Sequence, residues 1–465
     1  MAQRPPRVGK PPPPYKHQTA SIKALLGLQR GLDASDPGTG KTRVEIDLFA
    51  IRRKNGGKCA LIIAPKSLLR SAWEDDFRKF APHIKVSVCP AEKRIEGFEA
   101  EADVYVTNTD AAKWLAAQKP KFFAKFDTLI IDEISNFKHH TSMRSKAMNK
   151  IKKYFPYRYG LTGTPNANTI ADIWHQIFLI DDGRRLGGSF FHFRRQVCEP
   201  EQVGPQPHML KWVDKPGAEQ AVAHLLQDIV IRHQFEKCLD IPANHMYDRA
   251  YHMTPSQAKA YMAMERSGAA LLKQGAITTT NAAGVATKLL QIASGASYSG
   301  AGDEDYVPIA NERYELVADL VEQRQHSVVF FNWKHQRDHL IKEFEARGIT
   351  YVVIDGSTTD KNRKMAVDHF QAGFYRVLLA HPQSAAHGLT LTKGTATIWA
   401  SPTYNLEHFL QGNRRIYRAG QTMRTETIVI IAAGTIEEAV FQRLQDKNLK
   451  QLSMLDLLRD YFGER

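Results

Sequence analysis

The sequence predicts an α/β protein with two parallel-sheet lobes and helical insertions between them. Short apolar runs alternate with helical segments in the first part of the chain, and the same alternation returns after a helical middle. A glycine-rich phosphate-loop pattern lies near the start, and paired carboxylates follow a later apolar run. The length, 465 residues, also exceeds what one ordinary domain holds.

The change in pattern along the chain suggests where the domains begin and end. We expect a first lobe at residues 1–252, which includes a helical insertion at about 185–240. A second helical insertion and linker should occupy residues 253–310. Residues 311–465 should form the second lobe and end in a closing helix.

The strands expected in the first lobe are continuous apolar or β-branched runs, which is typical of strands buried on both faces of a parallel sheet. These runs are 60–64, 104–107 and 128–131. Helices should follow Lys41, Ser67 and Ser142.

The middle of the chain is dominated by helical patterns. Residues 219–230 and 256–273 predict helices, whereas the prolines at the ends of 200–216 indicate a loop. Residues 295–305 are typical of a flexible linker.

Apolar runs then return and predict the strands of the second lobe. They are 327–331, 351–354, 377–380, 397–399 and 428–431.

Charge and composition narrow the class of protein. The net charge of +14 is consistent with a nucleic-acid partner, although a solvated basic surface is the alternative. No apolar run is long enough to cross a membrane, and the proline-rich first 15 residues lack the apolar core of a secretory leader. The four scattered cysteines include no Cys-x-x-Cys pair, which argues against a zinc module or a disulfide framework. We therefore expect a cytoplasmic protein.

The phosphate-loop pattern runs from Ser35 to Thr42, with Ser35 in place of the usual first glycine. Gly38, Thr39 and Gly40 would bring backbone amides to phosphate oxygens, at the positive end of the helix that follows. Lys41 would contact the β- and γ-phosphates, and the Thr42 hydroxyl would hold Mg²⁺. A chance match in an ordinary loop is the alternative.

The carboxylates Asp132 and Glu133 follow the apolar run 128–131. Carboxylates at the end of a buried strand are costly unless they bind a metal or polarise water. Asp132 would support Mg²⁺, and Glu133 would orient and activate the attacking water. An acidic helix cap is the alternative.

Two arginines, Arg415 and Arg418, lie three residues apart within the segment 411–421. If the segment is helical, they share one face. Phosphoryl transfer spreads charge over the γ-phosphate oxygens, and a supplied arginine is worth on the order of 10³ to 10⁵ in rate. Solvated arginines on a basic protein are the alternative.

Taken in order, these motifs and several others resemble the Swi/Snf family of DNA translocases within the superfamily 2 helicase-type motors. The resemblance runs from about Tyr15 to Lys447. The other matching segments are Tyr15–Gln18, Ala64–Leu69 with Trp73, Leu161–Pro165 with Asn168, Asp132–Lys138, Ile231–His233 with Ile241–Pro242, Asp355–Ser357 with Arg363 and Phe370, Gly388–Leu391 and Gly434–Glu438.

The resemblance implies roles for further residues. Gln18 would read the adenine base, and Gly388 would contribute to the ATP site. Thr162, Gly163, Thr164 and Gln411 would couple the ATP site to the nucleic-acid site. Contacts to the DNA backbone would come from Lys66, Ser67, Thr107, Asn108, Lys334 and Ser357.

The family's known properties imply two RecA-like lobes, ATP and Mg²⁺ as nucleotide and metal, and double-stranded DNA as the partner. We expect a compact monomeric motor of bacterial or phage type, without further reader modules. Forked or branched DNA is a possible variant of the substrate. Two other functions stay open: a helicase that separates strands or remodels branched DNA or RNA, and a catalytically weak, nucleotide-gated DNA-binding scaffold.

The sequence departs from the family pattern in three places. Ile134-Ser135 stands where a small residue and a histidine are usual, so the link from water activation to the coupling motif can differ. Residues 384–387 replace a glycine-rich run, and His233 replaces the second of two arginines. For His233, a packing role is an equal alternative.

Overall fold

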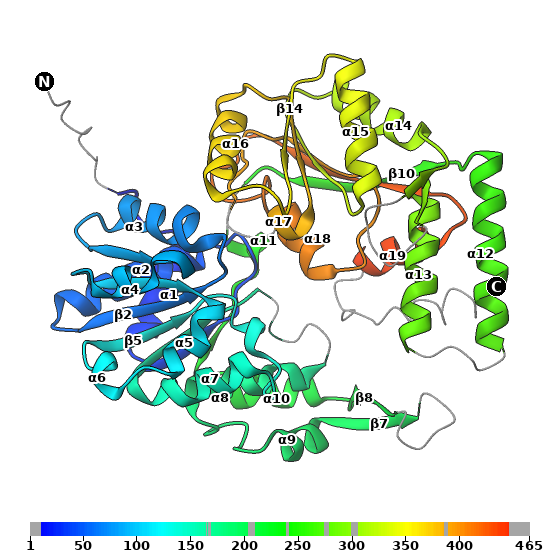
Figure 1. Cartoon of the computed structure of the whole chain (residues 1–465). Helices are drawn as coiled ribbons and strands as arrows, with labels where there is room; N and C mark the ends of the chain where they lie inside the picture. Colours follow the sequence, from blue (N-terminus) through cyan, green and yellow to red (C-terminus); the bar gives the residue numbers. More distant parts are fainter. Residues whose placement is uncertain are drawn as a thin grey trace, which may run out of the picture. The chain divides into compact units, whose positions relative to one another are not determined.

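The computed structural model describes residues 11–163, 165, 169–202, 210–238, 241–273, 279–298, 306–385 and 389–445. The chain divides into two compact units, Met1–Asp240 and Ile241–Arg465, and each is built around its own parallel sheet (Figure 1). The expected α/β class with two parallel-sheet lobes is thus confirmed.

The first unit has a seven-stranded sheet in the order β3-β4-β2-β5-β6-β1-β9, and every neighbouring pair is parallel. Its strands, including a separate hairpin, are β1 (Arg30–Asp33), β2 (Cys59–Ala64), β3 (Val86–Cys89), β4 (Val104–Asn108), β5 (Phe126–Ile131), β6 (Tyr157–Leu161), β7 (Cys198–Gln202), β8 (Leu210–Asp214) and β9 (Val230–Ile231). Its helices are α1 (Lys16–Leu26), α2 (Lys41–Lys54), α3 (Asp75–Phe80), α4 (Arg94–Glu99), α5 (Ala112–Ala116), α6 (Pro120–Phe123), α7 (Met143–Ile151), α8 (Ile173–Asp181), α9 (Phe190–Val197), α10 (Ala218–Leu226) and α11 (Phe235–Cys238).

Alternate side chains of the central strands supply two separate cores, one on each face of this sheet. Leu61 and Ile63 of β2 belong to one core, whereas Ala60 and Ile62 belong to the other. All four are fully buried, as a sheet covered by helices on both faces requires. The continuous apolar runs in the sequence follow from this double burial.

The insertion expected at about 185–240 is only partly helical. We expect a loop at 200–216, but within that range residues 200–202 and 210–214 belong to the strands of the antiparallel hairpin β7–β8. The helix expected at 219–230 ends at Leu226, and Val230 and Ile231 then pair with β1 at the edge of the main sheet. The prolines at 200 and 216 suggested a loop, but an isolated hairpin tolerates proline because both its strands are edges.

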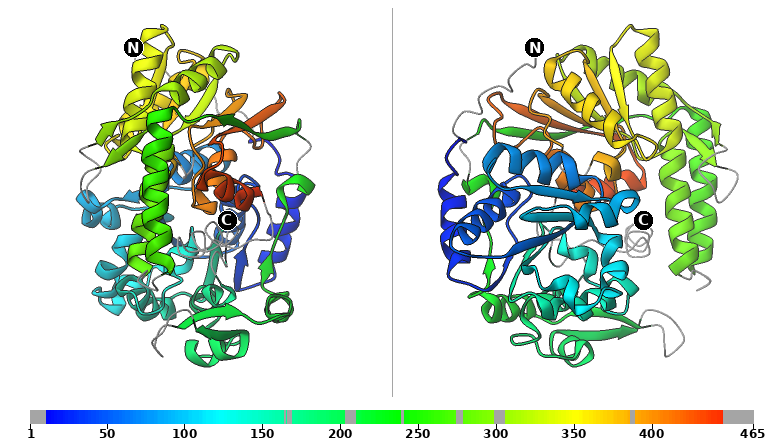
Figure 2. Two further views of the ribbon diagram at one scale, coloured as in Figure 1. Left: turned by 90° about the vertical axis from the view of Figure 1, so that its right-hand side faces the viewer. Right: turned by 60° about the vertical axis from the view of Figure 1, so that its left-hand side comes forward.

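The second unit has a six-stranded parallel sheet in the order β10-β17-β16-β13-β15-β14 (Figure 2). Its strands are β10 (Asn244–Tyr251), β11 (Ala296–Tyr298), β12 (Tyr306–Pro308), β13 (Ser327–Phe330), β14 (Tyr351–Ile354), β15 (Val377–Ala380), β16 (Ala396–Trp399) and β17 (Thr425–Ala432). Its helices are α12 (Pro255–Lys273), α13 (Thr279–Ala293), α14 (Glu312–Glu322), α15 (Lys334–Ala346), α16 (Asp360–Ala372), α17 (Pro382–Ala385), α18 (Leu406–Asn413) and α19 (Ile436–Gln445).

The division between the units falls at Asp240/Ile241, earlier than the expected boundary at 252. The reason is β10, which pairs with β17 along its whole length and so belongs to the second sheet. Its mixture of exposed polar and charged residues hid this strand from a search for apolar runs. The linker expected at 295–305 also begins with a strand, β11, which pairs with β12.

The helices expected as an insertion at 253–310 pack into the core of the second unit. Leu289 and Leu290 of α13 are buried there together with Val328 of β13. The Tyr261 hydroxyl of α12 accepts a hydrogen bond from the backbone amide of Ile436, where α19 begins (2.8 Å). This segment is therefore part of the second unit and supports its last helix.

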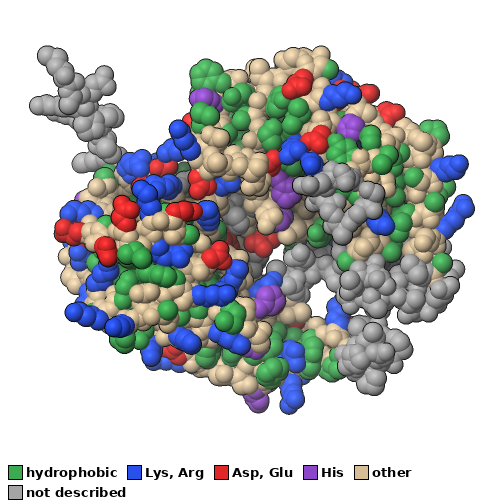
Figure 3. All heavy atoms as spheres, in the orientation of Figure 1, with side chains coloured by type: hydrophobic (Ala, Val, Ile, Leu, Met, Phe, Trp, Pro, Cys, Tyr) green, Lys and Arg blue, Asp and Glu red, His purple; other side chains and the backbone are tan. Residues whose placement is uncertain are grey.

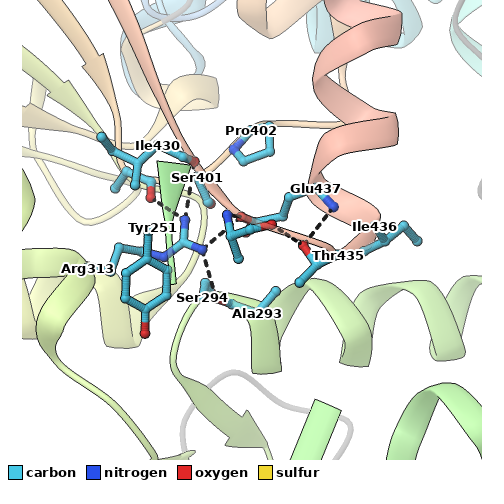
Figure 4. A network of polar contacts seen from close by, with 12 residues as sticks. Tyr251, Ala293, Ser294, Arg313, Ser401, Pro402, Ile430, Thr435, Ile436 and Glu437 are labelled. Carbon is cyan, nitrogen blue, oxygen red and sulfur yellow. Dashed lines mark hydrogen bonds and ion pairs between the residues drawn. The ribbon is translucent and has the colours of Figure 1, made fainter. Parts of the chain in front are cut away.

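A buried ion pair joins several elements of the second unit (Figure 4). The Arg313 guanidinium contacts the Glu437 carboxylate at 2.8 Å, and both side chains are almost fully buried. Arg313 also donates to the carbonyls of Ala293, Ala400 and Ile430. Glu437 accepts the backbone amide of Ala432 at 2.7 Å. The pair thus holds α13, α14, α19 and the ends of two strands together.

In the part of the chain that the structure describes, no helix combines the length and the apolar character that a membrane span needs. On the visible face of the molecule, Lys and Arg side chains lie among Asp and Glu side chains (Figure 3).

Candidate functional site

Three adjacent strands of the first unit, β5, β6 and β1, lead directly into three of the predicted motifs. Asp132 follows β5, Thr162 follows β6, and the phosphate loop follows β1. Because the strands are parallel, their carboxyl ends meet at one edge of the sheet, which is where ligands bind in open α/β sheets. The backbone amide of Thr162 also donates to the carbonyl of Asp33 at 3.1 Å. The fold therefore gathers the three motifs.

The phosphate loop uses two glycines in the left-handed region of backbone conformation. Gly38 has φ 87° and Gly40 has φ 84°, and α2 begins at the next residue, Lys41. A Cβ atom at Gly40 would collide with the side-chain amide nitrogen of Gln18. Glycine is thus required at Gly40 for two reasons, the backbone angle and the close approach of Gln18.

Two side chains of α1 hold the loop from one side. Gln18 Nε2 donates to the carbonyl of Thr39 at 3.0 Å, and a ring nitrogen of His17 lies 2.8 Å from the same oxygen. Gln18 Oε1 accepts the backbone amide of Tyr15 at 2.9 Å. The structure therefore places the predicted adenine-reading residue directly against the phosphate loop.

The start of the loop is held by residues from the end of the unit. The backbone amide of His233 donates to Ser35 Oγ at 3.0 Å, and that of Phe235 donates to the Asp36 carboxylate at 3.0 Å. A ring nitrogen of His233 also lies 3.0 Å from Ser21 Oγ of α1. Ser35, which replaces the usual glycine, thus has a defined partner, and His233 has a packing role. Sequence reasoning did not find this link, because nothing in the sequence indicates that residues 198 positions apart are neighbours.

Lys41 lies over the loop that precedes it. Its Nζ donates to the carbonyls of Ser35 at 2.7 Å and Asp36 at 3.3 Å. Thr39 Oγ1 donates to the Asp36 carbonyl at 2.8 Å. The ammonium group is thus held within the loop, where a phosphate oxygen could replace a carbonyl as its acceptor.

Asp132 is buried and held in place by the indole of Trp73, whose Nε1 donates to its carboxylate at 2.9 Å. Burial raises the pKa of Asp132, and the hydrogen bond from Trp73 and the positive charge of Lys41 oppose that rise. Trp73 was noted in the sequence as part of a motif, but its contact with Asp132 was not expected. An indole N–H can only donate, so it orients an oxygen of the carboxylate.

Glu133 adopts a left-handed backbone conformation with φ 49°, which is uncommon for a residue other than glycine. It precedes a short 3₁₀ helix, Ile134–Phe137. Strained backbone of this kind is concentrated at functional sites. Glu133 also occupies the N-cap position of that helix, and we keep it as the candidate water-activating residue.

Glu45 of α2 is a fully buried carboxyl group that sequence reasoning missed. Neither of its carboxyl oxygens has a hydrogen-bond partner among the residues that the structure describes. Burial, followed by the negative charge of Asp33, raises its pKa well above the usual range. Its position one turn after Lys41 was a detectable signal, because a glutamate is unusual on the buried side of a helix.

The donor set beside the loop fits Mg²⁺. Oxygen atoms of carboxylates and hydroxyls are the ligands that this cation prefers, and Mg²⁺ usually binds one or two protein ligands together with substrate phosphates and water. Asp132 and Thr42 supply such oxygens at neighbouring strand and helix ends. Among the described residues, no three His, Cys, Asp or Glu side chains form a metal site by themselves.

The predicted coupling motif lies against the phosphate loop. Thr162 is fully buried, and a Cβ atom at Gly163 would lie 2.8 Å from Pro37. Gln176 of α8 donates to the carbonyls of Pro165 (2.5 Å) and Asp172 (3.0 Å). Thr164 lies outside the described residues. Gly163 thus packs closely against Pro37, so the coupling motif and the phosphate loop are in direct contact.

The four residues expected to contact DNA in the first unit are not equally accessible. Lys66 is exposed and pairs with Glu92 at 3.7 Å, and Ser67 is partly exposed. Thr107, in contrast, is fully buried and donates to the Cys89 carbonyl at 2.8 Å. The Asn108 side chain is buried and accepts a hydrogen bond from Arg94 at 2.9 Å. The expectation for the Thr107 and Asn108 side chains therefore does not hold in this structure, because buried, bonded side chains cannot reach a phosphate.

The two residues expected to contact DNA in the second unit lie at the carboxyl ends of its strands. Ser357 is exposed after β14, and both its amide and its hydroxyl donate to the Asp355 carboxylate. Lys334 begins α15, after β13. Both positions fit the edge of a parallel sheet where ligands bind.

The two arginines of the second unit converge on one carbonyl. Arg418 donates to the carbonyl of Leu389 at 2.8 Å, and Arg415 donates to the same oxygen at 3.4 Å. Arg415 is buried and also donates to the carbonyl of Gln411 at 2.8 Å. Because α18 ends at Asn413, the arginines lie in the turns after it, so the condition of a shared helical face is not met. Gly388 lies outside the described residues.

Gln421 fixes the loop around Arg415 and Arg418. In the sequence it is only the last residue of the segment 411–421. Its buried side-chain amide donates to the carbonyls of Thr392, Gly394 and Ile416. Its oxygen accepts the amides of Thr422 and Met423. The residue thus fixes the loop that carries both arginines.

These features define the class of helicase-type ATPases. They are the phosphate loop, the carboxylates at a strand end, and a second parallel-sheet unit with paired arginines. The chain matches the SNF2-related domain over residues 17–295 and the helicase conserved C-terminal domain over residues 312–420. Because the first match covers more than half of the chain, the protein belongs to the SNF2-related family, and the expected family and type of enzyme are confirmed.

The chain is similar to proteins from phage and bacteria. It is 28% identical to the putative protein p41 of Acyrthosiphon pisum secondary endosymbiont phage 1, over 96% of this chain and 98% of that protein. It is 27% identical to an uncharacterized ATP-dependent helicase of Mycoplasma pneumoniae, over 93% of this chain but only 41% of that protein. Among solved structures, the Sulfolobus solfataricus SWI2/SNF2 ATPase core in complex with dsDNA is similar over 96% of this chain and 94% of that chain, with 22% identity and a TM-score of 0.45.

Proposed function

We propose that this protein is a motor that hydrolyses ATP and uses the energy to move along double-stranded DNA. The observation that carries the proposal is the meeting of phosphate loop, Asp132 and coupling motif at the ends of three adjacent strands. Membership of the SNF2-related family supports it. The net charge of +14 supports a polyanionic partner.

In this proposal, the first unit binds the nucleotide. Backbone amides of Gly38, Thr39 and Gly40 cradle the phosphates, and Lys41 exchanges a loop carbonyl for a β- or γ-phosphate oxygen. Gln18 reads the adenine base. When bound, Mg²⁺ would be held by Thr42 and Asp132, where it would neutralise phosphate charge. The expected contribution of Gly388 belongs to the same ATP site.

Glu133 orients and activates the attacking water in this scheme. Arg415 and Arg418 leave the Leu389 carbonyl and stabilise the charge that develops on the γ-phosphate. An arginine bonds more strongly to a charged phosphate oxygen than to a neutral carbonyl, which favours the exchange. Thr162–Thr164 and Gln411 transmit the state of the nucleotide to the DNA-binding surface.

The DNA backbone is held mainly by charge in this proposal. We retain Lys66, Ser67, Lys334 and Ser357 as contacts, because their side chains are at least partly exposed. Binding that depends on phosphate contacts loses affinity steeply as salt rises and reads little sequence.

The test is the rate of ATP hydrolysis by the purified protein with and without blunt duplex DNA, at low and at high salt. We expect duplex DNA to stimulate hydrolysis at low salt and less so at high salt. An unchanged rate at low salt would overturn the proposal. Displacement of a triplex-forming strand, compared with unwinding of a forked duplex, then distinguishes movement from strand separation.

A further inference from the structure

One surface of the first unit combines an exposed aromatic ring, several partly buried rings and an arginine. It is formed by α9, by the adjacent hairpin β7–β8 and by the segment before α7 (Figure 1). We call it the aromatic platform, and its members are His140, Phe190, Phe191, Arg194 and Trp212.

The members of the platform are in mutual contact. The Arg194 guanidinium lies 3.9 Å from the centre of the Trp212 ring and 5.5 Å from the rings of Phe190 and Phe191. The ring of His140 lies 4.3 Å from that of Phe190. Arg194 Nε has no hydrogen-bond partner among the described residues, so the rings hold this guanidinium.

The platform is anchored in the core beneath it. Phe190 contacts the buried Trp174 of α8, at 5.7 Å between ring centres, and Phe193 on the next turn is buried. The ring of Phe191, in contrast, is 57% exposed. A large aromatic ring held at the surface by buried neighbours is preorganised to bind a flat partner.

The charge around the rings is positive. Arg195 is exposed on α9, and the positive charges of Arg194, His139 and Lys146 lower the pKa of His140, after the larger effect of burial. Glu199 and Glu201 of the hairpin alternate with Pro200, which pairs directly with Trp212, whereas Asp214 shares the Trp212 face and accepts the backbone amide of Ile170 at 2.9 Å. Side chains alternate between the faces of a strand, so both glutamates project from the face opposite Trp212.

Nucleic acid with unpaired bases matches this combination. In a duplex, the flat faces of internal bases are stacked on one another, so exposed aromatic rings cannot stack on them. Unpaired bases present their faces, and proteins bind them with aromatic side chains and arginine beside a positive groove.

We propose that the aromatic platform binds unpaired nucleotides of the DNA substrate. The substrate would then be duplex DNA that continues into a single-stranded segment, rather than a blunt duplex alone. This inference rests on the proposed function, because it takes DNA as the substrate.

The platform also connects to the candidate catalytic segment. Trp174 contacts the next residue, His175, whose Nδ1 lies 2.5 Å from the carbonyl of Phe137. Phe137 ends the short helix that starts directly after Glu133. Unpaired nucleotides on the platform would therefore bind beside elements packed against the water-activating loop.

The test compares the affinities of the whole protein for a labelled oligothymidylate and for a blunt duplex of two complementary strands, by fluorescence anisotropy. Phe191→Ala removes the most exposed ring, and Phe374→Ala is the matched control, an exposed phenylalanine of the second unit (68%). We expect Phe191→Ala to weaken oligothymidylate binding roughly five- to one-hundred-and-fiftyfold, which corresponds to the loss of one base stack. Duplex binding, and both affinities of Phe374→Ala, should stay at the wild-type values.

Arg194→Lys is the second variant, because it keeps the charge and loses the planar guanidinium. It should weaken oligothymidylate binding while leaving the dependence of affinity on salt unchanged. Unchanged oligothymidylate affinity in Phe191→Ala would overturn the proposal and point to a protein partner. Equal weakening of single-stranded and duplex binding would also overturn it. Hydrolysis rates on blunt duplex test the motor separately, so failure of one proposal is distinguishable from failure of the other.

Discussion

In the first unit, the phosphate loop is held from several directions by other elements: Gln18 and His17 from α1, and the amides of His233 and Phe235 from the end of the unit. In the second unit, Arg415 and Arg418 converge on the carbonyl of Leu389. The loop is thus held by hydrogen bonds from elements on both sides of it. The arginines can exchange their carbonyl acceptor for a phosphate oxygen, which suits groups that act at one stage of a cycle.

The largest expected effect concerns the first unit, at the residue that we expect to activate water. Glu133→Gln keeps the size of the side chain and removes the carboxylate that activates water. We expect turnover to fall by roughly 10³-fold or more while ATP binding persists. The reason is that the variant loses both the general base and the group that orients the attacking water. Single-turnover hydrolysis and binding of a fluorescent nucleotide measure the two properties. Retained turnover would show that Glu133 is only an acidic cap.

The second prediction concerns what stabilises each unit. Arg313→Met breaks the buried ion pair of the second unit and leaves Glu437 buried without its partner, which costs roughly 3–5 kcal/mol. Hydrogen exchange should show that α19 and β17 lose protection, while the first unit keeps it.

Arg347→Ala is the matched control in the same unit. Arg347 pairs with Asp319 and Glu322, whose side chains are 55% and 45% exposed. Exposed pairs contribute about 0–1 kcal/mol, so this variant should remain near the wild type. If α19 and β17 lose the same hydrogen-exchange protection in both variants, the buried pair does not stabilise the second unit more than the exposed pairs do.

The smallest expected effect compares one buried histidine in each unit. Burial lowers the pKa of His175 in the first unit to about 4 and that of His335 in the second unit to about 3. An unfolded histidine has a pKa of about 6.5, so below that pH the unfolded chain binds a proton that the folded chain does not. Each histidine therefore makes the protein less stable as the pH falls from about 6.5 toward its folded pKa.

The replacements His175→Gln and His335→Gln should each reduce the acid dependence of the unfolding free energy by at most about 1.4 kcal/mol per pH unit. Urea unfolding at pH 7 and pH 5 measures this slope. The exposed His245→Gln is the control. If neither His175→Gln nor His335→Gln alters this slope, the lowered pKa values of the two histidines are contradicted.

The sequence predicted the parts of the fold that apolar runs specify. Strand β15 has the expected bounds, and it is buried between β13 and β14. The edge strand β14 also has the expected bounds, because residues 351–354 form an uninterrupted apolar run. The sequence did not predict β10, whose residues are largely polar, or β9, which has two residues. Both are edge strands, which lack the double burial that favours a continuous apolar run.

The motifs of the candidate site were visible because each is local in the sequence. The contacts that position them were not visible, because they join distant segments, as Trp73 joins Asp132 and His233 joins Ser35. Thr107 shows the opposite case. The family resemblance implied a contact between Thr107 and DNA, but its side chain faces inward and donates to the Cys89 carbonyl, as alternation along a strand permits.

The central proposal is that Arg415 and Arg418 stabilise the charge that develops on the γ-phosphate of bound ATP. The most direct test is single-turnover ATP hydrolysis by Arg418→Ala with duplex DNA present, together with nucleotide affinity. Arg418 is partly exposed, so its loss should leave the fold intact. We expect unchanged nucleotide affinity and a rate lowered by roughly 10³-fold or more. A wild-type rate, or loss of nucleotide binding together with turnover, would contradict the claim.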